Sequence, residues 1–194
     1  MEEAPRNILR KKLQDLVDGW RQTRLPGRST LMETGNSLSR WKTDQHLPGL
    51  WTPSPVMVTA TLDDGFGHGI HLIGLYASLC GVTLYPLGSL APPSRIIDAC
   101  QQYHPDILGL TVLRDDQEEA LVQIRKGVSP GTLLMAGGPA VMYDPDLASR
   151  VGIDRVCQDL RYFLEFLLGY EKIEKQSAAM DTPKPDRKDS PCAG

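Results

Sequence analysis

Hydrophobic positions follow two different periods along residues 55–174. Short apolar runs rich in β-branched residues alternate with longer segments whose apolar residues have helical spacing. The predicted strands are residues 56–62, 82–87, 106–112, 132–136 and 153–156. The predicted helices are residues 69–80, 93–103, 115–127, 142–150 and 159–170. Such alternation forms βαβ units, so we predict an α/β fold with a doubly wound, five-stranded parallel sheet of the flavodoxin-like (Rossmann-like) kind.

Residues 1–25 predict an N-terminal amphipathic helix. Its apolar stripe consists of Leu9, Leu13, Leu16 and Trp20. Such a stripe is buried either against its own domain or against a partner protein, and both alternatives remain open. Residues 26–54 are rich in Pro, Gly, Ser and Thr and predict an irregular connector. Residues 175–194 contain almost no large apolar residues and predict a disordered tail after the domain at 55–174.

Composition narrows the possible functions only a little. The chain has 194 residues, 41% of them hydrophobic, and a net charge of -3, which suits one domain with a real core. We expect no direct contact with nucleic acid, because no basic face is clustered in the sequence. No apolar run is long enough for a membrane helix and no signal peptide is recognisable, so we expect a cytoplasmic protein. Cys80 and Cys100 fall on apolar helix faces and are predicted core residues.

The loop from Asp63 to His71 is the first candidate for a binding site. Three of its glycines fall within five positions, which lets the backbone approach a ligand closely. The carboxyl ends of parallel strands share one edge of a sheet, where ligands of this fold class bind. Segments 87–93, 111–116 and 137–140 reach the same edge. Asp63 and Asp64 are expected to point apart, with one of them capping the following helix.

These motifs resemble the cobalamin (vitamin B12)-binding domain of B12-dependent methyltransferases, mutases and sensors. That family has D-x-H-x-x-G after its first strand, S-x-L after its third and G-G after its fourth. The resemblance covers roughly residues 55–170, and its Gly88 turn is also in register. It implies a corrinoid cofactor held by Asp64, Gly65, Phe66, Gly67, His68, Gly69, Gly88, Thr111, Leu113, Gly137 and Gly138.

One position departs from the family pattern. The family's histidine is the lower ligand of cobalt, but Phe66 occupies that position here and cannot coordinate a metal. The resemblance therefore implies cobalamin that keeps its own base on cobalt, or a non-standard axial ligand. His68 and His71 are the nearby candidate metal ligands, and His46 is a third. Two imidazoles beside a flat pocket also suit haem iron, so haem is the alternative cofactor.

The expected function is that of a stand-alone cobalamin (corrinoid)-binding protein acting as a sensor or an accessory carrier. No nucleophile or acid–base pair is recognisable, so catalysis as a methyltransferase or mutase would need another subunit. The expected partner is a transcription regulator or a catalytic subunit, bound through the N-terminal helix. Loss of the axial histidine favours an alternative, a degenerate and cofactor-free interaction module. A haem-binding sensor of the same fold is the other alternative.

Overall fold

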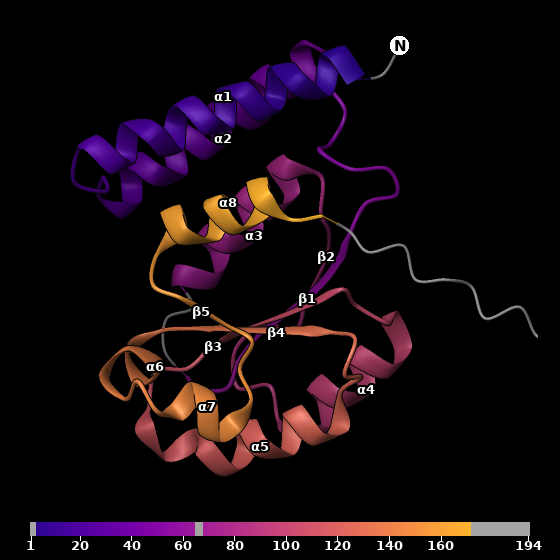
Figure 1. Ribbon diagram of the computed structural model, residues 1–194, viewed down its shortest axis with the longest axis vertical. Helices are drawn as coiled ribbons and strands as arrows, with labels where there is room; N and C mark the ends of the chain where they lie inside the picture. Colours follow the sequence, from indigo (N-terminus) through magenta and orange to yellow (C-terminus); the bar gives the residue numbers. More distant parts are fainter. Residues whose placement is uncertain (1–2, 65–67, 172–194) are drawn as a thin grey trace, which may run out of the picture.

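A five-stranded, entirely parallel sheet forms the centre of the molecule (Figure 1). The structure, a computed structural model, describes residues 3–64 and 68–171. The sheet order is β2-β1-β3-β4-β5, the flavodoxin-like order, so the predicted fold class is confirmed. The strands are β1 (Val56–Thr61), β2 (Thr83–Pro86), β3 (Ile107–Thr111), β4 (Leu133–Gly137) and β5 (Arg155–Cys157).

Helices cover both faces of the sheet, and a further pair of helices lies outside one of them. In Figure 1, α3 and α8 lie above the sheet, α1 and α2 lie above these, and α4 to α7 lie below the sheet. The helices are α1 (Glu3–Gln22), α2 (Arg28–Asp44), α3 (His68–Cys80), α4 (Pro93–Tyr103), α5 (Glu118–Gly127), α6 (Pro139–Tyr143), α7 (Leu147–Val151) and α8 (Leu160–Gly169), with a 3-10 turn at Asp115–Gln117.

The strands divide the core into two hydrophobic clusters, because successive side chains point to opposite faces of a sheet. Val58 and Ala60 of β1 pack on the α4 and α5 side. Met57 and Ile107 pack on the α3 and α8 side. Cys80 and Cys100 are buried, one in each cluster, as predicted. Burial raises the pKa of the Cys80 thiol to about 12, so this cysteine acts as a small apolar side chain.

The apolar stripe of α1 is buried within its own chain. Leu9 and Leu13 are 0% exposed and Trp20 is 6% exposed, all in the cluster on the α3 and α8 side of the sheet. Leu16, the fourth predicted residue of the stripe, is only partly buried, and Val17, at 0% exposure, takes the inner position instead. Arg21 reinforces this docking, because its Nε donates to Glu165 Oε1 of α8 at 2.8 Å. Docking within the chain, one of the two predicted alternatives, is therefore what the structure shows.

The predicted irregular connector over residues 26–54 is wrong for its first half, where α2 forms. Its inward face combines Leu31 with Gly35, so no continuous apolar stripe marks the helix in the sequence. A Cβ atom added to Gly35 would lie 2.6 Å from Leu75 Cδ2 of α3. The glycine thus allows close packing of α2 on α3. The Tyr76 hydroxyl of α3 completes the contact by donating to the Leu31 carbonyl at 2.9 Å.

The prediction of a single helix over residues 142–150 is also wrong. Two short helices, α6 and α7, occupy this region, and Asp144 between them has extended backbone. The cause is Pro145, because the residue before a proline is disfavoured in helical conformation. Among the described residues, no helix has the length and apolarity that crossing a membrane requires.

The close packing at Gly35 predicts that a side chain added there destabilises the protein more than one added at an exposed glycine. Gly35→Val should lower the free energy of unfolding by about 1–3 kcal/mol, because the new methyl groups meet Leu75 and Tyr76. The matched control is Gly19→Val on the exposed side of α1, where an added Cβ meets nothing within 4 Å. Gly19→Val should change the free energy of unfolding by less than about 0.5 kcal/mol. Urea unfolding followed by circular dichroism measures both, and equal effects would contradict the close α2–α3 packing.

Candidate functional site

A cavity of about 310 Å³ opens at the carboxyl edge of the sheet. Its floor is formed by β1, β3 and β4, and its walls by α3 and α8. After β1 the chain crosses to β2 on one side of the central strand pair, and after β3 it crosses to β4 on the other side. The cavity therefore lies at the point where the strand order reverses. Ligands of doubly wound proteins bind at this point. The cavity is therefore the first candidate site of the described chain.

Small and apolar residues give the cavity its shape. Gly109 in the middle of β3 and Gly137 at the end of β4 contribute no side chain to the floor, and Met57 and Met135 lie beside them. Phe163 of α8 closes one wall. A cavity with this lining accepts a compact and largely apolar group.

The structure brings five of the sequence-predicted site residues to this cavity. They lie at the start of α3, at the end of β3 and after β4, and they are Gly69, Thr111, Leu113, Gly137 and Gly138. The position of Gly138 requires glycine, because its φ is +111° and an added Cβ would lie 2.4 Å from the Val112 carbonyl oxygen. The backbone at Gly138 therefore packs directly against the backbone of Val112, which holds the loop after β4 against the loop after β3.

Gly88 and His71 lie together in a neighbouring groove. This groove has a volume of about 330 Å³ and shares Thr59 and Ile70 with the main cavity. Gly88 has a φ of +82°, and its carbonyl accepts from the Thr61 N–H at 2.9 Å. Its role in the described structure is to fix the turn after β2 beside the end of β1.

The remaining predicted site residues do not reach the cavity, or cannot be placed. Asp64 is exposed and is absent from the cavity wall. Gly65, Phe66 and Gly67, as well as the side chain of His68, lie outside the described residues.

His46 cannot ligate a metal at this edge. It lies beside Ser78 and Leu79, near the last turn of α3, whereas the cavity adjoins the first turns of that helix. The prediction of His46 as an axial ligand is therefore wrong. His71 is exposed and faces the neighbouring groove. In the described part of the chain, no three His, Cys, Asp or Glu side chains converge as a metal site.

Asp63 ties together three loops at the carboxyl edge. Its Oδ2 accepts from the Leu113 N–H after β3 at 2.8 Å, and its carbonyl accepts from the Leu90 N–H after β2 at 3.2 Å. Asp63 is 3% exposed, whereas its neighbour Asp64 is exposed, so the two carboxylates point apart as predicted. The described contacts of Asp63 are bonds between loops and do not include the predicted helix cap.

Two buried oxygen atoms at this edge have no hydrogen-bond partner. They are Asp63 Oδ1 and Thr61 Oγ1. Thr61 is the last residue of β1 and Asp63 follows two residues later, and neither residue lines the cavity. Buried polar atoms are normally hydrogen-bonded, and an unpaired one lowers stability.

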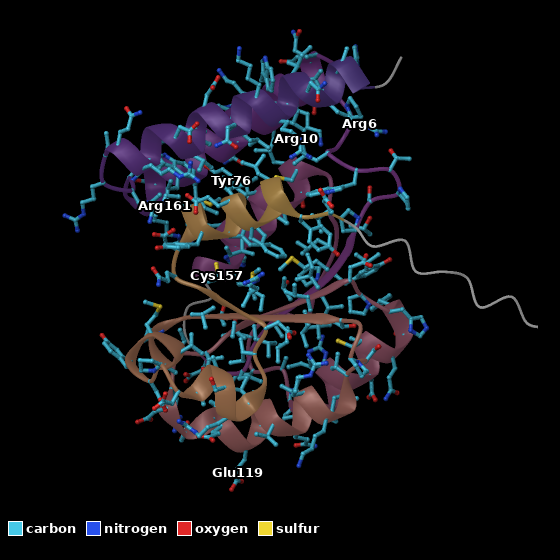
Figure 2. All side chains as sticks on the ribbon, in the orientation of Figure 1. Arg6, Arg10, Tyr76, Glu119, Cys157 and Arg161 are labelled. Carbon is cyan, nitrogen blue, oxygen red and sulfur yellow. The ribbon has the colours of Figure 1, made fainter. Side chains whose placement is uncertain are left out.

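The end of β5 and the loop after it supply the last wall of the cavity. Cys157 lines the cavity, and Figure 2 shows it between the sheet and α8. Burial and the nearby Asp159 carboxylate raise the pKa of the Cys157 thiol to about 12, so the thiol stays protonated at neutral pH. Asp159 caps α8 by accepting from the Tyr162 N–H at 3.0 Å. This loop carries no recognisable motif, and sequence reasoning missed it.

Gly109 and Asp63 are the missed residues for which the sequence contains a signal. A glycine inside a strand often marks a close approach of backbone or ligand, and Gly109 interrupts an otherwise apolar strand. Asp63 follows the end of β1 after Leu62, but its partner Leu113 is fifty residues away. Nothing local in the sequence identifies that pairing.

Comparison with known proteins supports the same architecture. No family model and no curated protein sequence matches the chain. A solved cobalamin-binding protein from Desulfitobacterium hafniense DCB-2 superposes with a TM-score of 0.70 at 18% identity, covering 85% of this chain and 82% of that one. The monomethylamine corrinoid protein of Methanosarcina barkeri superposes with a TM-score of 0.51 at 13% identity, covering 58% of this chain and 56% of that one. At these identities the likeness shows a shared fold.

The first likeness also extends beyond the sheet and its own helices. The superposed region is 85% of this chain, which is longer than the segment from β1 to α8. It therefore includes part of the N-terminal helical layer. The match to the monomethylamine corrinoid protein, at 58%, is no longer than the sheet domain itself.

The bond between Asp63 and Leu113 predicts a difference between two adjacent aspartates. Asp63→Ala should lower the free energy of unfolding by about 1–3 kcal/mol, because it leaves the Leu113 N–H without its acceptor. Asp64→Ala, the control at the exposed neighbour, should change it by less than about 0.5 kcal/mol. Amide hydrogen exchange at Leu113 should accelerate only in the first variant. Unchanged exchange there would contradict the bond.

Proposed function

We propose that this chain is a stand-alone cobalamin (corrinoid)-binding protein that acts as a sensor or an accessory carrier. The observation that carries the proposal is the apolar cavity at the β1–β3 reversal, lined by Gly69, Thr111, Leu113, Gly137 and Gly138. These are positions at which the sequence resembles cobalamin-binding domains. The fold shared with a cobalamin-binding protein adds support.

The residues present suit the two parts of cobalamin. The wide corrin ring cannot enter a cavity of about 310 Å³ and would lie across the carboxyl edge. The compact aromatic base, which a nucleotide tail joins to the ring, matches the apolar lining around Met57, Met135 and Phe163. The Thr111 hydroxyl provides a polar contact for the tail. Bound cobalamin would supply a cobalt centre for alkyl or electron transfer, while this chain binds and orients it.

The same cavity favours cobalamin over haem. A haem is a flat ring without an appended base, so it would leave the cavity beneath the sheet edge unfilled. His71, one of the proposed metal ligands, faces the neighbouring groove. Haem therefore remains the alternative cofactor, with less support from the described residues.

Two modes of cobalt ligation are compatible with Phe66. In the first, cobalamin keeps its own base on cobalt. In the second, the base enters the cavity and cobalt takes a non-standard ligand, such as water or His68. The size and lining of the cavity favour the second mode. The two modes give different visible spectra, so one titration distinguishes them.

The proposal includes a protein partner, either a transcription regulator or a catalytic subunit. Leu9, Leu13, Val17 and Trp20 of α1 are buried in the cluster on the α3 and α8 side, so contact through the N-terminal layer would use its outer side. A groove between α1 and α2, lined by Leu16, Leu38 and Trp41, opens on that side. A cytoplasmic location belongs to the same proposal. The free thiols of Cys80, Cys100 and Cys157 agree with a reducing compartment.

A cofactor-free interaction module is the second candidate function. Phe66 in the position of the axial histidine favours it, because phenylalanine supplies no ligand for cobalt. The candidate predicts a folded protein that binds no corrinoid at all.

Binding of hydroxocobalamin tests the proposed function directly. Purified protein mixed with hydroxocobalamin and then desalted should retain a red chromophore with a shifted visible spectrum. Quenching of tryptophan fluorescence during titration gives the dissociation constant. Colourless protein after desalting would overturn the proposal and leave the interaction module.

A cavity variant tests where the cofactor binds. Gly69→Phe should weaken cobalamin binding by about tenfold or more, because the ring obstructs the cavity. The protein should remain folded, since an added Cβ at Gly69 meets nothing within 4 Å. Gly19→Phe on α1 is the matched control and should bind like the wild type. Equal affinity of the two variants would exclude the cavity as the site of the base.

A further inference from the structure

The outer layer of the molecule carries a groove between α1 and α2. Its volume is about 690 Å³, larger than that of the cavity at the sheet edge, and the two share no lining residue. The two helices form the outermost layer in Figure 1. The groove is lined by Lys12, Asp15 and Leu16 of α1 and by Glu33, Thr34, Ser37, Leu38 and Trp41 of α2.

The floor of the groove is apolar. Leu16, Leu38 and Trp41 are half-buried, because they pack on the core cluster on the α3 and α8 side and also line the groove. Apolar and aromatic side chains gathered in a concave surface are typical of the centre of a protein–protein contact. A helix laid into a groove of this kind buries its apolar face.

The charged residues of the groove lie at different ends of it. Only five residues separate α1 from α2, so the two helices run antiparallel as a hairpin. The Lys12 ammonium lies 6.0 Å from the centre of the Trp41 ring, so these two residues share one end. Glu33 precedes Trp41 by eight residues on α2, which is about 12 Å along a helix axis. Asp15 follows Lys12 on α1 and lies toward the Glu33 end.

This arrangement is complementary to itself. A two-fold axis through the middle of the groove would turn a second copy end for end, as in a closed symmetric dimer. The Lys12 end of each copy would then face the Glu33 end of the other, with Leu16 and Leu38 near the axis. Among the described residues, neither Lys12 nor Glu33 forms an ion pair, so both charges are free to pair across the interface.

We infer that this groove binds the same groove of a second copy of the chain, so that the protein forms a two-fold dimer through α1 and α2. The inference goes beyond the proposed function and does not depend on cobalamin. Because the groove and the cavity share no residue, the dimer leaves the cavity accessible. A regulator or catalytic subunit that used this groove would have to displace the second copy.

Charge complementarity favours a second copy over an unrelated helix as the occupant. A helix with charges of one sign would match one end of the groove and meet a like charge at the other. The second copy supplies a carboxylate opposite each Lys12 and an ammonium opposite each Glu33, and both contacts form twice. Charges placed in this way determine which partner binds and in which orientation.

Charge reversals at the two ends test the interface. Lys12→Glu and Glu33→Lys should each weaken dimerisation by about tenfold or more, because each places like charges together at both symmetric contacts. Both side chains are exposed, so circular dichroism should show folded proteins. Sedimentation velocity over a range of protein concentrations gives the dimer dissociation constant.

The matched controls carry the same charge changes on the opposite side of the sheet. They are Lys126→Glu and Glu119→Lys on α5, where both residues are exposed. Glu119 points away from the rest of the molecule in Figure 2. Both control variants should dimerise like the wild type.

A mixture of the two groove variants gives the sharpest result. When Lys12→Glu and Glu33→Lys are combined in equal amounts, a heterodimer should form with an affinity close to that of the wild type. The two introduced charges then face each other at one contact, and the native Lys12 and Glu33 face each other at the second. Native mass spectrometry distinguishes the heterodimer by its mass. Recovery in the mixture cannot arise from a change in folding, since each variant alone has the same fold as in the mixture.

Three outcomes would overturn the inference. A monomer at every concentration would leave the groove to a different protein. A dimer that both reversals leave intact would place the interface elsewhere on the molecule. Two weakened variants that do not associate when mixed would exclude the pairing of Lys12 with Glu33. Retention of hydroxocobalamin after desalting is measured on the same samples, so the dimer and the proposed function succeed or fail independently.

Discussion

The pairing of β1 with β3 is the constraint on which the rest of the structure depends. A carboxylate closes each end of this pair. At the amino end, Asp106 Oδ2 accepts from the Val56 N–H at 2.8 Å, and at the carboxyl end Asp63 Oδ2 accepts from the Leu113 N–H at 2.8 Å. The chain then diverges to opposite sides of the sheet. The cavity exists because the loops separate above two strands that are held firmly together.

The N-terminal layer stabilises the site from the outside. The helices α1 and α2 pack on α3 and α8, the same two helices that form the walls of the cavity. Tyr76 lies at the centre of this contact, with its ring 6.0 Å from that of Trp20 and its hydroxyl bonded to Leu31 (Figure 2). Burial raises the pKa of Tyr76 to about 12, so the hydroxyl remains a donor at physiological pH. The added helices therefore hold the cavity walls from the side away from the sheet.

The parts of the fold that could be predicted are those specified by local pattern. Each predicted strand lies within one or two residues of the observed one, because buried parallel strands read as short apolar runs. The α2 helix could not be predicted, because it packs through Gly35 and has few apolar residues of its own. The cavity was predictable only in part. Gly137 and Gly138 belong to a motif, whereas Cys157 and Phe163 reach the cavity through the path of the whole chain.

The missing histidine has a consequence for the proposed binding of cobalamin. A protein imidazole on cobalt normally contributes to both the affinity and the orientation of the cofactor. Phe66 cannot make that contribution, so in the proposed complex the affinity would come from burying the base in the cavity and from contacts around the ring. Asp63 holds the loops after β1, β2 and β3 together through its bonds to Leu113 and Leu90, so the residue that joins the two central strands also fixes the loops at the carboxyl edge.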